Sequence, residues 1–140
     1  MAVVKSRRGE SPVQFLETAR ELEVYTLTQC ARFPKAFMFL ITQELAQLAR
    51  GVLNDIKSAN SIFPANAAEV QMRLDFWTAA NCKLQCLVSQ LDIARQLITH
   101  TAKNKPIHET VWRTWAELIA REAKLIAAVK KQDKTRYKGL

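Results

Sequence analysis

Two cysteines spaced four residues apart are the residues in this sequence that most suggest site chemistry. Cys82 and Cys86 occupy the ends of "CKLQC", and a helix would place both thiols on one face. Paired thiolates can bind zinc, but a zinc site needs three or four protein ligands. The only histidines, His100 and His108, are remote in sequence. The favoured interpretation is that both cysteines are buried as small hydrophobic residues, with no metal and no other cofactor.

A proline among aromatic and basic residues marks a second candidate, "CARFPKAFMF" at residues 30–39. The segment is either an aromatic-basic binding patch or the corner between two helices. Pro34 favours the corner, because a proline pushes the preceding residue out of the helical region. Phe33 and Phe37 are then expected to pin the corner. Phe39 falls off the apolar stripe of the next helix and is expected to face a partner subunit.

Polar residues interrupt two apolar stripes that are otherwise regular. Asn81 lies on the stripe of the third predicted helix, and Glu122 lies on that of the fourth. A polar group at a helix seam is costly unless it is paired. One interpretation is that these residues specify register or oligomeric state, as polar core residues do in coiled coils. The other is that the stripes drift and both residues reach the edge of the bundle.

The three tryptophans have helical spacing, which favours core or seam positions over platforms for stacking bases. Trp112 and Trp115 cannot easily both point inward together with Val111 and Leu118. One of the two is therefore expected to face a partner subunit, because aromatic residues are enriched at interfaces. The predicted subunit interface contains Phe39, Trp112 and Trp115.

No catalytic motif is present in the sequence. A nucleophile elbow, a glycine-rich phosphate loop and an HExxH motif are all missing, so we expect a protein that is not an enzyme. No apolar run reaches the roughly 18 residues of a membrane span, and the N-terminus has no apolar stretch typical of a secretory signal. The odd number of cysteines fits no secreted disulfide framework, so we expect a cytoplasmic location.

The chain is basic, and its basic residues are concentrated near the C-terminus. The formal net charge is +8, and residues 106–140 contain eight Lys or Arg against four acids, which is half of that charge. Such a balance favours partners that carry phosphates or acidic surfaces.

Hydrophobic periodicity predicts an all-α fold, an antiparallel up-down four-helix bundle over residues 11–131. Apolar residues recur every three or four positions, as in Phe37, Ile41, Leu45, Leu48, Val52 and Ile56. Helices are expected at about 11–33, 35–59, 67–101 and 108–131, with Asn66 capping the third. Short loops between long amphipathic helices favour antiparallel neighbours. We expect a flexible basic N-terminus at 1–10 and a basic tail at 132–140.

The segments that form the Phe-Pro corner and the helices carry a family resemblance. "RFPKAFMFLITQELAQLARGVLNDIKSAN", "ANSIFPANAAEVQMRLDFWTAANCKLQCLVSQL" and "VWRTWAELIAREAKLIAAV" resemble two related groups of four-helix-bundle proteins. These groups are the ribosomal RNA intervening-sequence proteins and the accessory variability determinant (Avd) proteins of diversity-generating retroelements. The resemblance covers roughly residues 14–130. It implies a homopentameric basic barrel that binds a reverse transcriptase and structured RNA, or an RNA/DNA hybrid, and supports mutagenic cDNA synthesis.

The basic balance and the resemblance together predict a nucleic-acid interface on the third and fourth helices and the loop between them. The predicted nucleic-acid-binding residues are Arg73, Lys83, Arg95, Lys103, Lys105, Arg113, Arg121, Lys124, Lys130 and Lys131. The alternative is an oligomeric protein-interaction scaffold of the intervening-sequence type that does not bind nucleic acid.

Overall fold

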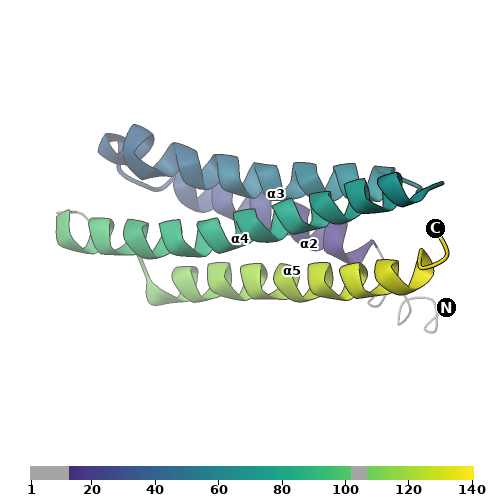
Figure 1. Cartoon of the computed structure of the whole chain (residues 1–140). Coiled ribbons are helices and arrows are strands. Elements are labelled where there is room, and N and C mark those ends of the chain that lie inside the picture. The colour runs from purple at the N-terminus through teal and green to yellow at the C-terminus, as the bar shows by residue number, and fades with distance from the viewer. Residues whose placement is uncertain (1–12, 102–106) are drawn as a thin grey trace.

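The computed structural model of the protein describes residues 13–101 and 107–140, and within these ranges it contains helices and no strands. The main helices are α2 (Gln14–Cys30), α3 (Gln43–Ser61), α4 (Ala67–Thr101) and α5 (Glu109–Arg136). Helix α3 packs on α2 and α4, and α5 packs on the same two helices. Figure 1 shows the long helices lying side by side, and their buried apolar residues form one hydrophobic core. The all-helical, four-helix part of the predicted fold is confirmed.

The corner between α2 and α3 has the form that its proline predicts. Helix α2 ends at Cys30, and Pro34 adopts an extended backbone with ψ of 138°. A 3₁₀ turn (Lys35–Phe37) and a π turn (Met38–Thr42) then lead into α3. Phe33 and Phe37 are buried against the core. The π turn widens the helix next to the proline, where the regular hydrogen-bond ladder has not yet begun.

Gly51, in the middle of α3, lies in close contact with a lysine of α4. The aliphatic part of the Lys83 side chain lies so close that a Cβ on residue 51 would sit 2.7 Å from its Cδ atom. The Lys83 ammonium group continues across α3 to the Asp55 carboxylate. Glycine therefore leaves room for the Lys83 side chain to cross the α3–α4 seam, and a Cβ at this position would displace the end of that flexible side chain.

A capping box begins α4. The Asn66 side-chain oxygen accepts the Glu69 backbone N–H at 3.0 Å, and the Glu69 carboxylate accepts the Ala65 N–H at 2.8 Å. The first bond satisfies a backbone donor that a helix start otherwise leaves unpaired, and the second ties the residue before the cap to the first turn, in a variant of the usual capping box. The predicted cap and the predicted span of this helix, 67–101, are both confirmed.

We expect Asn66→Ala to lower the free energy of unfolding by about 1 kcal/mol, because it removes the acceptor of the Glu69 N–H. Urea denaturation followed by circular dichroism measures this change. Asn54→Ala is the control, since Asn54 is an exposed residue inside α3. Equal stability of Asn66→Ala and the wild-type protein would show that the capping bond contributes nothing.

Helix α4 exposes two cysteines that were predicted to be buried. Cys82 and Cys86 are both exposed, and only Cys30 is buried. The prediction of two buried thiols in α4 is therefore wrong. The core face is instead formed by Trp77, Ala80, Leu84, Leu87, Leu91, Ala94 and Ile98. Helix α4 has apolar residues on several faces, Val88 and Ile93 among the exposed ones, so its sequence leaves the phase of the buried stripe ambiguous.

Helix α5 is longer than predicted. The helix was expected to end near Lys131, but it continues to Arg136. Residues 132–136 of the predicted tail at 132–140 are therefore helical. The reason is Asp133, which is only 1% exposed and is anchored to α4. The predicted flexible N-terminus, residues 1–10, lies outside the described residues. Among the described helices, none has the length and hydropathy needed to span a membrane.

Candidate nucleic-acid interface

A buried ion pair joins α4 to the last turns of α5. The Arg73 Nε atom donates to Asp133 Oδ2 at 2.7 Å, and its Nη2 atom donates to Oδ1 at 3.3 Å. The indole Nε1 of Trp77 donates to Asp133 Oδ2 at 2.8 Å. Arg73 Nη1 donates to the carbonyl oxygens of Ala59 and Ile62, at 3.0 Å each. We call these three side chains, Arg73, Trp77 and Asp133, the anchor cluster.

The anchor cluster corrects the prediction that Arg73 contacts nucleic acid. Arg73 is 5% exposed, and its guanidinium group already binds one carboxylate and two carbonyls. It also lies 5.3 Å from the Trp77 ring and 5.8 Å from the Tyr137 ring, where a cation is attracted to the aromatic face. Arg73 therefore holds α3, α4 and the end of α5 together and does not present a free charge to phosphate.

Trp112 and Trp115 are also placed differently from the prediction, since both are buried within the protein. Trp115 is fully buried and donates its indole N–H to the Thr26 hydroxyl at 2.9 Å. The Trp112 ring stacks on it with a centroid separation of 5.8 Å and an interplanar angle of 13°. Both rings fit inside because they stack in parallel and Val111 lies only partly inside. The expectation that one of the two faces a partner subunit is wrong.

Basic residues without an acidic partner follow one another along the C-terminal half of α5 and the turn after it. We call them the basic cluster: Lys124, Lys130, Lys131, Lys134, Arg136 and Lys138. None forms an ion pair with a described residue, and all but the half-buried Lys130 are exposed. The only acid that follows Glu122 in the sequence is Asp133, and Arg73 already neutralises it inside the bundle. This end of α5 therefore carries a local excess of positive charge.

The other cations that were predicted to bind nucleic acid have different surroundings from one another. Lys83, Arg95 and Arg121 form ion pairs with Asp55, Glu109 and Glu21, respectively. Arg113 is exposed and forms no ion pair with a described residue. Lys103 and Lys105 lie outside the described residues. Of the predicted residues, Lys130 and Lys131 border one groove, and Lys124 lies earlier on the same helix.

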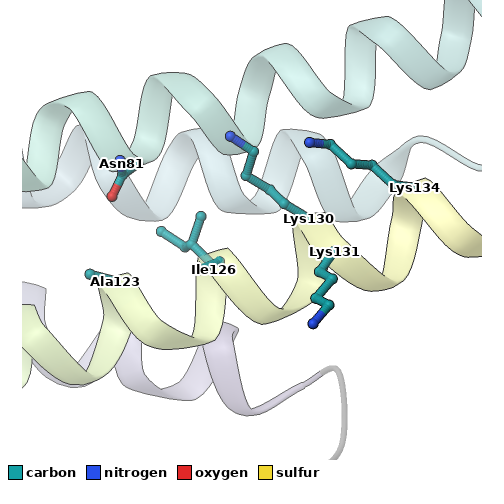
Figure 2. A pocket seen from close by; sticks show the side chains of 7 residues that line it. Asn81, Ala123, Ile126, Lys130, Lys131 and Lys134 are labelled. Carbon is teal, nitrogen blue, oxygen red and sulfur yellow. The ribbon is translucent and has the colours of Figure 1, made fainter.

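A groove between α4 and α5 borders the basic cluster. Its volume is about 280 Å³, and its walls are Asn81, Ala123, Ile126, Ala127, Lys130, Lys131 and Lys134. Figure 2 shows Lys130 and Lys134 extending toward α4, whereas Lys131 points to the other side of α5. Lys130 is held in this position because its ammonium group donates to the Thr78 hydroxyl of α4 at 3.1 Å. The groove therefore combines an apolar floor with a basic rim.

The two polar residues of the apolar stripes have different surroundings. Asn81 is half-buried and lines the groove, so it lies at the edge of the bundle, as one of the two interpretations expected. Glu122 is fully buried, and neither of its carboxylate oxygens has a hydrogen-bond partner among the described residues. Burial raises the pKa of the Glu122 carboxyl to about 8. A carboxyl in such a site holds its proton at neutral pH.

The α2–α3 corner carries an exposed apolar patch formed by Met38, Phe39 and Leu40. Their exposed fractions are 44%, 88% and 68%. Phe39 is therefore free to contact a partner, and its assignment to a subunit interface stays a prediction.

Sequence reasoning missed Lys134, Arg136 and Lys138 as members of the basic cluster, because it assigned them to a tail. The signal that could have found them is the run of cations after Glu122 with Asp133 as its only acid.

In the described part of the chain, no group of three or more His, Cys, Asp or Glu side chains is arranged to hold a metal ion. No protein-family model, curated protein or solved structure matches the chain.

Proposed function

We propose that this protein is a non-enzymatic accessory protein that binds structured RNA through the basic cluster. The observation that carries the proposal is the excess of cations at the end of α5, next to the groove. Lysine and arginine side chains that lack an acidic partner are available to replace the counterions of a phosphate backbone. The anchor cluster supports this role because it fixes the helix that presents these cations. A retroelement accessory protein that assists a reverse transcriptase is the biological role that we infer from the resemblance to Avd proteins.

We infer that the helices form an antiparallel up-down bundle and that five copies form a barrel, as the resemblance implies. The contacts Arg73–Asp133 and Arg95–Glu109 support opposite directions for α4 and α5. Arg95 follows Arg73 along α4, whereas its partner Glu109 precedes Asp133 along α5. The exposed patch at the α2–α3 corner supports association between copies, because apolar side chains gain from burial. Light scattering measures the mass of the assembly, and a monomer would contradict the barrel.

RNA binding by the full-length chain tests the proposed function. We expect a structured RNA to bind at low salt, with an affinity that falls steeply as salt rises, because counterion release drives the association. Electrophoretic mobility shift at low and physiological salt measures this dependence. Absence of binding, or binding that salt does not weaken, would contradict the electrostatic interface.

A second candidate function is a scaffold that binds only protein, and the exposed Met38–Leu40 patch favours it. Copurification under ribonuclease treatment separates the two functions. A complex that contains no RNA and survives ribonuclease would favour the scaffold. A complex that contains RNA and dissociates under ribonuclease would favour the accessory protein.

A further inference from the structure

We propose that the groove between α4 and α5 holds an unpaired nucleotide of the bound RNA, with its base on the apolar floor. This inference rests on the proposed RNA binding and adds a selectivity to it, for unpaired over fully paired RNA. The floor is formed by Ala123, Ile126 and Ala127, and the Asn81 carboxamide borders it from α4. A base in a duplex keeps both faces stacked on its neighbours, so only an unpaired base can place a face on this floor.

The chemistry of the groove matches that of a nucleotide in two ways. Apolar side chains receive the face of a base that has left its stack, and a carboxamide offers both a donor and an acceptor to the base edge. The ammonium groups of Lys130 and Lys134 extend along the α4 side of the groove, where a phosphate would lie next to the base (Figure 2). Neither lysine has an acidic partner among the described residues.

A second hollow supports a path for more than one nucleotide. It has a volume of about 530 Å³ and is lined by Ala128, Lys131, Gln132, Thr135 and Arg136. Lys131 borders both this hollow and the groove, and Figure 2 shows it pointing away from α4. A single strand that crosses α5 at Lys131 would therefore meet basic side chains on both sides of the helix. This arrangement resembles the way proteins track single strands, by cations along the backbone and surfaces for the bases.

Filling the groove without changing its charge tests the inference. We expect Ala127→Leu to weaken the binding of a hairpin RNA with an unpaired loop by about tenfold, equivalent to about 1.4 kcal/mol. Binding of a blunt duplex with the same stem should change by less than about twofold, because backbone contacts remain. Fluorescence anisotropy at fixed salt measures both affinities. Asn81→Leu, which removes the carboxamide and narrows the groove from α4, should show the same selectivity.

Ala120→Leu is the matched control, because Ala120 is an exposed alanine about two turns earlier on the same helix and does not line the groove. Circular dichroism and thermal melting confirm that each variant keeps the wild-type fold. Equal losses for hairpin and duplex in both groove variants, or no loss for either RNA, would overturn the inference. Displacement of the hairpin by a polyglutamate peptide, with no competition from free loop RNA, would also overturn it and assign the groove to an acidic protein segment.

The outcomes separate this inference from the proposed function. If the wild-type protein binds both RNAs in a salt-dependent manner and Ala127→Leu does not discriminate between them, the groove assignment fails and RNA binding stands. If the wild-type protein binds neither RNA, the proposed function fails, and the groove assignment fails with it.

Discussion

Replacing Asp133 by alanine should lower the free energy of unfolding by about 3–5 kcal/mol, the largest stability loss that we expect from a single substitution. Asp133 is 1% exposed and accepts hydrogen bonds from Arg73 and from the Trp77 indole. Without it, the Arg73 guanidinium remains buried with its charge uncompensated, and the Trp77 N–H loses its acceptor. Guanidinium denaturation at neutral pH measures the loss.

Two further variants show whether the loss of stability comes from the uncompensated charge of Arg73. The double variant Arg73→Met with Asp133→Leu removes both charges and should recover much of the lost stability, because apolar residues of similar size can replace a buried ion pair. Asp75→Ala, at an exposed aspartate of α4, should change stability by no more than about 0.5 kcal/mol. A loss below about 1 kcal/mol for Asp133→Ala would contradict the role of the anchor cluster.

Replacing Glu122 should change the pH dependence of the free energy of unfolding more than any other single substitution. Glu122→Leu should stabilise the protein by about 1–3 kcal/mol at pH 8 and above, because it removes a buried carboxyl that has no hydrogen-bond partner among the described residues. Leucine also fills much of the same space with apolar atoms, which favours burial. Denaturation curves at a series of pH values measure the change.

The direction of the pH dependence follows from the raised pKa of Glu122. Its folded-state pKa of about 8 lies above the ordinary value of 4.5, so the unfolded chain loses this proton first as pH rises. The contribution of Glu122 to stability is therefore largest below about pH 4.5, declines up to about pH 8 and levels off above it. The decline has an upper limit of about 1.4 kcal/mol per pH unit.

Glu122→Gln isolates this effect, because glutamine has a similar shape and does not titrate. We expect the variant to lack the part of the decline that Glu122 causes between pH 5 and 8. Glu117→Gln is the matched control, since Glu117 is an exposed glutamate on the same helix, and it should keep the wild-type slope. Identical slopes for Glu122→Gln and the wild-type protein would show that Glu122 is ionised in the folded state.

The helices could be predicted from the sequence because periodicity and caps are local signals. The stripe from Phe37 to Ile56, the corner at Pro34 and the cap at Asn66 all depend on residues within a few turns of each other. The π turn after Pro34 was not foreseen, because no propensity distinguishes it from the start of a helix. The end of α5 was also missed, because Asp133 is held by Arg73, sixty positions earlier in the chain.

The candidate site was predicted less well, because the position of a charge does not reveal its partner. Arg73 and Lys130 are both basic residues in helical segments, yet Arg73 is buried against a carboxylate and Lys130 lines a groove. The spacing of Trp112 and Trp115 predicts that only one of them points inward together with Val111 and Leu118, whereas both are buried because the two rings stack on each other. Tertiary contacts of this kind decide which cations are free to meet an anion.

The salt dependence of RNA affinity, compared between two triple variants, tests most directly whether the basic cluster is the interface. One variant replaces Lys130, Lys131 and Lys134 by glutamine. The other removes the same charge elsewhere, through glutamine at Arg20, Lys35 and Lys57, which are exposed and lie on other elements. We expect the first variant to reduce the slope of log K against log salt concentration by about 2, and the second to leave it nearly unchanged. Equal slopes for the two variants would contradict an RNA interface at the C-terminal end of α5.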